Sequence, residues 1–325
     1  MRKLGKLMGR AALAGFLAGF AAAAQSQEFP VKPMRVIVPY ATSGTPDVVA
    51  RFLGQQMSVT LGQPVNVENR PGAGGLPAVQ ELIRSAPDGY TMLIGDVGQY
   101  AILPALRPGS YDPVNDWRTL GQITINAVFV MVNNQIPAKT MPEFIALVKS
   151  RPGHYSYGSA GVGTVHHLFM EAIKVAYGLD MVHVPFKGSS QTVPAMLNGD
   201  IPICICGVTT TQQFIKEGKL RVLAASTKGR DKLAPDVPSA SEFGNPDLDF
   251  ASTQGYFVPA ATPRPIMDKL AAALAKAAQS PEFLAREVQL GTVVAYLAPE
   301  PFAEYVRASY ARYQRVIKAA GIKTE

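Results

Sequence analysis

The sequence predicts an α/β protein made of two lobes, each a mostly parallel sheet flanked by helices. Short apolar strand segments alternate with amphipathic helical segments, and this alternation occurs in two successive runs. The chain then ends in helical segments that have no strands of their own to cover. With 325 residues, of which 47% are hydrophobic, the chain is long enough for two buried cores.

The first run covers residues 34–96. Apolar, largely β-branched segments at 34–40, 64–70 and 90–96 predict strands, and the helical segments between them follow small-residue turns. Gly62 is the expected stop of the first helix, because glycine readily adopts the left-handed conformation that ends many helices. The β-α-β-α-β order indicates parallel pairing of these strands.

The second run repeats this pattern. Strands are predicted at 127–134, 154–161, 181–188, 201–208 and 219–227. The helix over 140–153 has Thr140 as its expected N-cap and Glu143 three residues later, which is the spacing of a capping box. The helix over 164–178 is expected to stop at Gly178.

The last part of the chain is predicted to return to the first lobe. An extended segment is expected at 249–260, followed by helices over 265–279, 281–290 and 299–320. No third sheet is available for these helices, so the economical arrangement packs them on the first one.

This arrangement defines the expected domains. Lobe 1 comprises residues 25–126 and 253–325, and lobe 2 comprises residues 127–252. Two strands, near 121–132 and 249–258, would cross between the lobes and act as hinges.

Residues 1–24 have the pattern of a cleaved secretory signal, with a basic start and an apolar stretch that ends in small residues at Ala22 to Ala24. The apolar stretch is about 14 residues long, short of the roughly 20 needed to span a bilayer. We therefore expect a periplasmic protein whose mature chain starts near Gln25. Without the four Lys and Arg residues of this segment, 27 basic and 24 acidic residues remain, a near balance that argues against nucleic-acid binding.

The two cysteines, Cys204 and Cys206, alternate with isoleucines in an apolar segment. Residues two apart on a strand share a face at a spacing of about 6.5–7 Å, which is at the upper limit for a disulfide. We predict two buried, unpaired thiols. No His, Cys or carboxylate pattern has metal-ligand spacing, so neither a metal site nor a cofactor is expected.

Three small-residue turns lie between a predicted strand and a predicted helix, at 42–47, from Gly72, and at 158–164. Helix N-termini present unpaired N–H groups and a positive dipole end, and glycine lets backbone approach a ligand closely. Such turns are natural cradles for a carboxylate or phosphate. Because ligands of open α/β sheets bind beyond the carboxyl ends of the strands, turns from the two lobes are expected to line one cleft.

Other functions receive less support from the motifs. No G-x-G-x-x-G fingerprint or P-loop is present, which argues against a nucleotide. No nucleophile elbow is present either, although a hydrolase or isomerase that uses His167 with Ser159 stays open. Asp47 fits a dipole-favoured acid at a helix start and a ligand contact equally well. Asp96 ends the third strand beside the expected cleft, where it would repel a second carboxylate unless protonated or bridged by water.

Several segments resemble the periplasmic substrate-binding proteins of tripartite tricarboxylate transporters, the Bug-type family. The segments that carry the resemblance are KPMRVIVPYATSGTPDVVAR, ENRPGAGG, APDGYTMLIG, YDPVNDW, YGSAGVGTVHHL and VHVPFKGSSQTVPAMLNGD. The resemblance covers the whole mature chain. It implies a two-lobe Venus-flytrap fold of type II, no enzymatic activity, and capture of a small organic carboxylate for delivery to the membrane components of a tripartite tricarboxylate transporter. A sensory binding protein that presents its ligand to a receptor kinase is the alternative, and a monomer is expected.

Carried over by position, the resemblance also implies the ligand-binding residues. They come from the first-lobe turn, the end of the third strand, the second-lobe turn and the facing walls: Tyr40, Ser43, Gly44, Thr45, Asp47, Asp96, Ser159, Gly163, Thr164, His167, Pro185 and Gly207. Residues 97–99, 186–188 and 208 are expected to complete the walls.

The chain departs from the family pattern at four places. Thr42-Ser43-Gly44 replaces the usual Pro-Gly-Gly, Asp96 replaces a small hydroxyl residue, Pro202 replaces an aspartate, and Thr253 replaces an aromatic residue. Thr253 is expected to leave room for a bulkier ligand. The candidate ligands are di- and tricarboxylates, acidic amino acids and aromatic carboxylates, and we expect one with an amine, a hydroxyl or an aromatic ring besides the acid.

Overall fold

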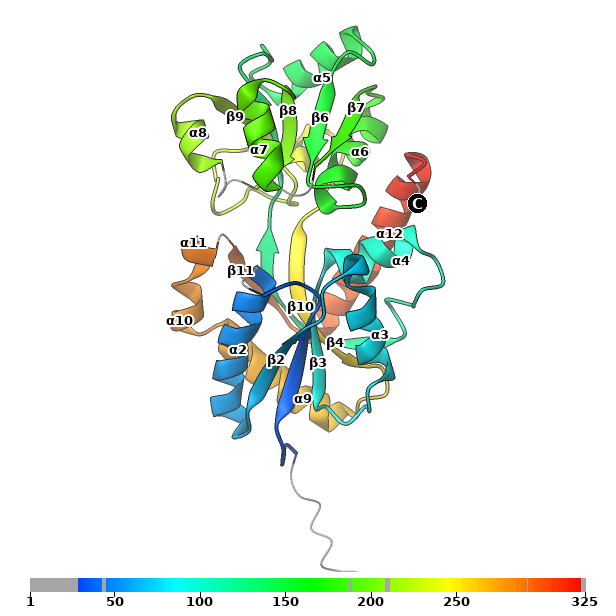
Figure 1. Cartoon of the computed structure of the whole chain (residues 1–325), viewed down its shortest axis with the longest axis vertical. Coiled ribbons are helices and arrows are strands. Elements are labelled where there is room, and N and C mark those ends of the chain that lie inside the picture. Colours follow the sequence, from blue (N-terminus) through cyan, green and yellow to red (C-terminus); the bar gives the residue numbers. More distant parts are fainter. Residues whose placement is uncertain (1–28, 43–44, 187–188, 208–210, 291, 323–325) are drawn as a thin grey trace, which may run out of the picture.

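The computed structural model describes residues 29–42, 45–186, 189–207, 211–290 and 292–322. They form two α/β lobes that lie one above the other along the longest axis of the molecule (Figure 1). This confirms the predicted two-lobe α/β fold class. The predicted signal segment lies outside the described residues, and so do Ser43 and Gly44.

The lower lobe in Figure 1 contains a six-stranded sheet in the order β11-β4-β10-β3-β1-β2. Its strands are β1 (Met34–Val38), β2 (Val65–Asn69), β3 (Thr91–Asp96), β4 (Trp117–Asn126), β10 (Ser252–Pro259) and β11 (Val293–Leu297). β1 pairs in parallel with β2 and β3, as the sequence predicted. β10 runs antiparallel to β3 and β4, and β11 runs antiparallel to β4.

The upper lobe contains a five-stranded sheet in the order β7-β6-β8-β5-β9. Its strands are β5 (Phe129–Asn133), β6 (Ser156–Ser159), β7 (Val182–Pro185), β8 (Ile203–Cys206) and β9 (Leu220–Ala225). β6 is parallel to β7 and β8, whereas β5 is antiparallel to β8 and β9.

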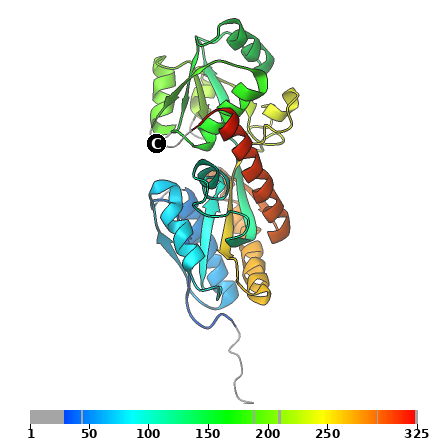
Figure 2. The same ribbon diagram turned by 90° about the vertical axis from the view of Figure 1, so that its right-hand side faces the viewer.

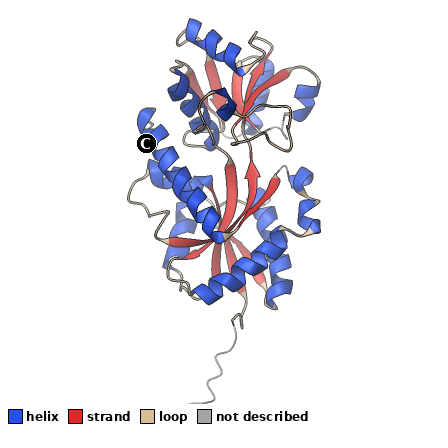
Figure 3. Cartoon of the chain, turned by 180° about the vertical axis from the view of Figure 1, so that it is seen from behind, coloured by secondary structure: helices blue, strands red, loops and turns tan. Residues whose placement is uncertain are grey.

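Both sheets are therefore mixed, and the antiparallel strands are those next to the passages between the lobes. The chain leaves the lower lobe through β4, enters the upper lobe through β5, and returns through β10 (Figures 1 and 3). A strand that brings the chain back beside the one by which it left runs in the opposite direction. The predicted βα repeats form the parallel centre of each sheet, and these strands complete it.

Helices cover both faces of each sheet. The lower lobe has α2 (Thr45–Leu61), η1 (Ala73–Gly75), α3 (Leu76–Arg84), the π-helical turn η2 (Gly98–Ile102), α4 (Leu103–Leu106), α9 (Arg264–Ala278), α10 (Pro281–Leu284), α11 (Glu287–Leu290) and α12 (Pro299–Ala319). The upper lobe has α5 (Met141–Ser150), α6 (Val165–Tyr177), α7 (Ser189–Asn198), α8 (Gln212–Lys216) and η3 (Ala240–Phe243).

The expected helix boundaries are mostly confirmed. The Thr140 hydroxyl accepts a hydrogen bond from the Glu143 N–H at the start of α5, and Gly178 ends α6 in the left-handed conformation. The predicted helix over 281–290 is instead two short helices, α10 and α11. β11 was not predicted, because it is a single apolar strand in a region that otherwise has a helical pattern.

The upper-sheet strand β5 shows how alternation divides the core. Val130 and Val132 belong to the cluster that contains Phe144 of α5, whereas Phe129 and Met131 belong to the cluster of α7 and α8. Successive side chains of β5 are therefore buried on opposite faces of the sheet.

Helix α12 belongs to the lower lobe and also contacts the upper one. Phe302, near its start, packs 5.6 Å from Phe257 of β10, and Tyr313, near its end, packs 4.9 Å from Phe250. Figure 2 shows the helix running along the side of the molecule from the lower lobe to the upper one. The C-terminal helices thus return to lobe 1, and the last of them also braces the passage between the lobes.

The two cysteines are buried and unpaired, as predicted, on the strand β8. Burial raises the pKa of the Cys204 thiol. Among the described residues, no helix is long and apolar enough to cross a membrane. In the same part of the chain no group of three or more His, Cys, Asp or Glu is placed to hold a metal ion.

Candidate functional site

A pocket of about 470 Å³ lies between the two lobes, and we call it the cleft pocket. This volume is in the range of small-molecule sites. Its lower wall is formed by Tyr40, Ala73, Gly74, Asp96, Val97, Gly98, Gln99, Ile102, Leu103, Leu106 and Arg107, its upper wall by Ala160, Val162, Gly163, Thr164, Val165 and His166, and its side by Ser252. It therefore lies beyond the carboxyl ends of β1, β3 and β6, where α/β sheets bind their ligands.

Hydrogen bonds fix the polar centre of the lower wall. The Tyr40 hydroxyl donates to Oδ2 of Asp96 at 2.6 Å, and the Gly98 N–H donates to Oδ1 at 2.7 Å. Gln99 Nε2 donates to the Tyr40 hydroxyl at 3.2 Å and to the Gly74 carbonyl at 3.0 Å. These contacts join the ends of β1 and β3 to the glycine-rich turn before α3.

Gly75 explains why this turn is rich in glycine. Its φ is +89°, and a Cβ there would lie 2.8 Å from Gln99 Nε2 and from Pro39 Cβ. Only glycine combines the left-handed backbone with so close an approach. The turn thus serves to hold Gln99, and through it Tyr40, in place.

Asp96 has no described cationic partner. It makes no ion pair with any Lys, Arg or His in the part of the chain that the structure describes; the partners of its carboxyl group are the Tyr40 hydroxyl and the Gly98 N–H. Burial is the main cause that raises the pKa of its carboxyl, and the bonds from Tyr40 and Gly98 oppose this. Burial and the neighbouring Asp96 also raise the pKa of Tyr40, so Tyr40 stays a donor.

The upper wall is the turn from β6 into α6. The Thr164 hydroxyl caps the helix by accepting from the His167 N–H at 3.4 Å, and it donates to the Gly161 carbonyl at 2.8 Å. Val165 and His166, the first residues of α6, line the cleft pocket. A helix of 13 residues that starts at the pocket offers its first N–H groups and its positive end to an anion.

His166 lies at the start of α6 and lines the pocket. Burial lowers its pKa to about 4, so it is neutral at pH 7. Its Nδ1 atom is buried without a hydrogen-bond partner in the described chain.

The rest of the cleft pocket is largely apolar, with one exposed cation. Ile102, Leu103 and Leu106 face Val162 and Val165 across it. Arg107, at the end of α4, is exposed and makes no side-chain hydrogen bond or ion pair within the residues that the structure describes. Gly163, with φ +74°, is close enough to the lower lobe that a Cβ would lie 2.8 Å from Leu106 Cδ1.

Ser159 and His167 do not pair with each other. Ser159 is fully buried, and its Oγ lies 2.7 Å from Nε2 of His183. The His167 ring stacks on His183 at 3.9 Å, and its Nδ1 accepts a hydrogen bond from the Gly163 N–H at 3.2 Å. These side chains support the β6–α6 turn from inside the upper lobe, and none of them lines the cleft pocket.

Asp47 is held at the start of α2. It is buried, and it pairs with Arg51 at 2.9 Å and accepts from Asn69 Nδ2 at 2.9 Å. Its described contacts thus tie α2 to the end of β2. Thr45, Pro185 and Gly207 are likewise absent from the described walls of the cleft pocket.

Thr253 was expected to leave extra room for the ligand, and that expectation is wrong. Its side chain is fully buried, and its hydroxyl is hydrogen-bonded to the Tyr100 hydroxyl. The Tyr100 side chain therefore occupies the neighbouring space in the core. The adjacent Ser252 lines the cleft pocket instead, because successive residues of a strand point to opposite faces.

Of the predicted binding residues, the structure brings Tyr40, Asp96, Gly163 and Thr164 together around the cleft pocket. Other lining residues were not predicted. Most of them belong to η2, α4 and the residue after α4, and the main ones are Ile102, Leu103, Leu106 and Arg107, with His166 and Ser252 in addition. The apolar segment after Asp96 has neither a clear strand period nor a clear helix period. The Pro104 in the segment also weakened any helix prediction there.

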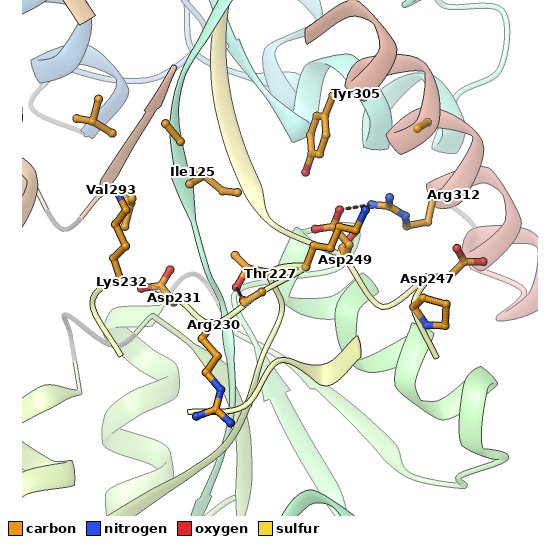
Figure 4. Close-up of a pocket in the computed structure, with 16 residues that line it drawn as sticks. Ile125, Thr227, Arg230, Asp231, Lys232, Asp247, Asp249, Val293, Tyr305 and Arg312 are labelled. Atoms are coloured by element: carbon orange, nitrogen blue, oxygen red, sulfur yellow. Dashed lines mark hydrogen bonds and ion pairs between the residues drawn. The ribbon is translucent and has the colours of Figure 1, made fainter. Parts of the chain in front are cut away.

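A second pocket, of about 700 Å³, lies at the other face of the crossing strands, and we call it the rear pocket (Figure 4). Ile125, which lines it, is opposite Thr253 in the β4–β10 pairing, whereas the cleft-lining Ser252 is opposite Asn126. Since adjacent residues of a strand face opposite ways, the crossing strands separate the two pockets.

Two buried acids of the rear pocket accept backbone hydrogen bonds from the two passages between the lobes. The Asp249 carboxylate pairs with Arg312 of α12 at 3.4 Å and accepts from the Ala251 and Lys228 N–H groups (Figure 4). The Asp231 carboxylate accepts from the Leu233 N–H at 2.8 Å and from the Ala127 N–H. Ala127 lies between β4 and β5, and Ala251 directly precedes β10. Burial raises the pKa of both acids.

Comparison with known proteins identifies the family. A family model described as the tripartite tricarboxylate transporter family receptor matches residues 49–322. A protein of Agrobacterium vitis, named for the ttuE–ttuC′ intergenic region, is 33% identical over 303 residues, which is 92% of this chain and 87% of the relative.

Three solved structures are similar over most of the chain. MatC of Rhodopseudomonas palustris with bound malate is 32% identical, with a TM-score of 0.70 over 89% of this chain and 100% of that one. An R. palustris protein with adipate is 27% identical, with a TM-score of 0.73 over 91% of this chain and 99% of that one. A Polaromonas TctC solute-binding protein without ligand is 25% identical, with a TM-score of 0.81 over 89% of this chain and 99% of that one. The protein belongs to the receptor family of the tripartite tricarboxylate transporters, the TctC or Bug-type periplasmic solute-binding proteins.

Proposed function

We propose that this protein captures a small organic carboxylate in the cleft pocket, closes its lobes on it, and delivers it to the membrane components of a tripartite tricarboxylate transporter. The observation that carries the proposal is the position of the cleft pocket, between the start of α6 and the end of β3. A carboxylate there would accept hydrogen bonds from the N–H groups at the start of α6. Two related proteins bind malate and adipate, which are small organic carboxylates.

Closure is supported by the comparison of conformations. The chain superposes better on the ligand-free Polaromonas protein, with a TM-score of 0.81, than on the malate-bound protein, with 0.70. The malate-bound protein is nevertheless the more similar in sequence, at 32% against 25% identity. We therefore take the described conformation as the open one, with residues 25–126 and 253–325 and residues 127–252 as the moving lobes.

The proposal includes no catalysis. The hydroxyl of Ser159 is buried away from the cleft pocket, and its histidine partner is His183 rather than the pocket-lining His166. A nucleophile must reach its substrate, and this serine does not reach the pocket. We further propose that the protein acts in the periplasm as a monomer after removal of residues 1–24.

Two measurements test this function. A thermal-shift screen over small carboxylates should identify a ligand, because a ligand at 100 times its Kd adds about 2.7 kcal/mol to the stability. Small-angle scattering with that ligand should show a smaller radius of gyration. Tight binding without compaction would contradict closure, and turnover of the bound ligand would contradict a purely receptive role.

A further inference from the structure

We infer that the preferred ligand has one carboxylate and, at its other end, a hydrogen-bond-donating group that meets Asp96, so that the protein selects amino or hydroxy monocarboxylates over dicarboxylates. The inference rests on the proposed function, since it names the ligand class of the same pocket.

The first step is the coordination of Asp96. A carboxylate has about four acceptor positions, and the side chain of Asp96 receives one hydrogen bond on each oxygen, from Tyr40 and from Gly98. Both donors are uncharged. Asp96 also lines the cleft pocket, so its remaining acceptor capacity is available to a ligand.

The second step is the charge. No described Lys or Arg pairs with Asp96, and the neighbouring Tyr40 and Gln99 are neutral. A second carboxylate of a ligand would meet acceptor oxygens here: it would be repelled by the charged form of Asp96, and the two groups could pair only by taking up a proton. An ammonium or hydroxyl group would instead donate to Asp96, and an ammonium would also neutralise it.

The third step is the rest of the cleft pocket, which suits one carboxylate and an apolar body. The start of α6 and the exposed Arg107 supply the positive features. Between them and Asp96 lie apolar side chains, among them Ile102, Leu103 and Val165. The pocket thus has a carboxyl acceptor without a cationic partner, positive features and an apolar wall, which is complementary to a ligand with one acid and one donor.

Matched ligand pairs test the inference. Isothermal titration calorimetry at pH 7 would compare 4-aminobutanoate with succinate, 6-aminohexanoate with adipate, and 4-(aminomethyl)benzoate with terephthalate. Members of a pair have nearly the same length and differ at one end. We expect the amine of the best-fitting pair to bind at least tenfold more tightly than its diacid.

Variants assign the preference to the carboxylate of Asp96. Asp96→Asn keeps the shape and removes the charge, and it should reduce the preference to threefold or less or reverse it. Asp96→Ser is a second variant in case Asp96→Asn fails to fold, which thermal unfolding would reveal. Asp268→Asn is the control, because this acid is exposed on α9 and pairs with Arg264 outside the pocket; it should keep the preference of the parent.

Each outcome decides between the proposals. A diacid that binds the parent more tightly than its amine partner overturns this inference and leaves the proposed function intact. A preference for the amine that persists in both Asp96 variants also overturns it. If no member of any pair binds, the proposed capture of a small carboxylate fails, and this inference fails with it.

Discussion

The cleft pocket and the rear pocket lie on opposite faces of the same crossing strands, and their ionisable side chains differ in whether they have partners within the protein. In the cleft pocket, Asp96 has only neutral donors, and Arg107 has no described ion-pair partner. In the rear pocket, Asp249 is paired with Arg312, and Asp231 is satisfied by two backbone N–H groups.

We interpret this difference as the one between the proposed ligand site and the proposed hinge. An unpaired charge in a cleft is costly in the free protein, and a complementary ligand offsets that cost on binding. A paired charge beside a hinge instead fixes the two passages between the lobes. Rigid lobes that close on one face of the crossing strands must also separate on the other, so closure changes the rear pocket as well.

The largest expected effect concerns the rear pocket. Arg312→Met should lower the free energy of unfolding by about 3 kcal/mol at pH 7, because it leaves the Asp249 carboxylate buried without its cation. Urea denaturation measures this. The control is Arg315→Met on the same helix, whose pair with Asp247 has the same 3.4 Å distance but is exposed and is worth less than about 1 kcal/mol.

The pH dependence of the Arg312→Met effect gives a second readout. The pKa of Asp249 is already raised in the folded protein, and loss of Arg312 raises it further. The charged carboxylate is then costly above its folded pKa, and this cost disappears as the pH falls and the group is protonated. A loss of stability that stays the same from pH 8 to pH 5 would show that the pair is not its cause.

The second prediction concerns the contact between the lobes at the cleft pocket. Gly163→Ala should weaken ligand binding at least tenfold, because its Cβ would be 2.8 Å from Leu106 Cδ1, on the opposite wall. Gly178→Ala is the matched control, since Gly178 also has a positive φ, +63°, but has open space around it. Both variants should lose about 1–2 kcal/mol of stability through backbone strain. Equal affinities in calorimetry would show that the cleft does not close on Gly163.

The third prediction tests the cost of the unpaired charge. Asp96→Asn should raise the stability of the ligand-free protein by about 1 kcal/mol at pH 7, or the Tm by about 2–4 °C. The folded pKa of Asp96 is raised, so its charged form costs stability above that pKa, and the cost is absent below the unfolded pKa. The gain should therefore shrink as the pH falls toward 4. Calorimetric scans that show a lower Tm for the variant at pH 7 would contradict this.

The smallest effect is expected at the exposed end of the cleft pocket. Arg107→Gln should weaken carboxylate binding about threefold to tenfold and reduce its dependence on salt, because the guanidinium is exposed and screened. Arg84→Gln, at the exposed end of α3, is the control for net charge. If the salt dependence of the association rate is unchanged in the variant, Arg107 does not attract the ligand to the cleft pocket.

Much of the fold could be predicted because local patterns determine it. The strands from β1 to β9 show apolar segments bounded by turns, and the caps at Thr140 and Gly178 are local interactions that the sequence makes visible. β11 was missed because one edge strand among helices has no repeat to reveal it. The strands β4, β5 and β10 were predicted, but their antiparallel pairing was not, because strand direction depends on how the chain passes between the lobes.

The site was only partly predictable, for a related reason. Tyr40, Asp96, Gly163 and Thr164 follow strands or precede helices, so the rule for the carboxyl ends of strands places them at the cleft. The same rule placed Ser159 and Asp47 there, but their side chains are turned to His183 and to Arg51. A residue's place at a sheet edge does not determine which neighbour satisfies its side chain.

By itself, the sequence determined most of the order of strands and helices, the two-lobe architecture and the family, because these depend on periodicity, turn residues and motifs read along the chain. Only the tertiary structure decided which charges have partners. Asp249 meets Arg312 from 63 residues away, whereas no described cation approaches Asp96. Pairing depends on which distant elements pack together, and that packing gives Asp249 a cation beside the passages between the lobes and leaves Asp96 without one in the cleft pocket.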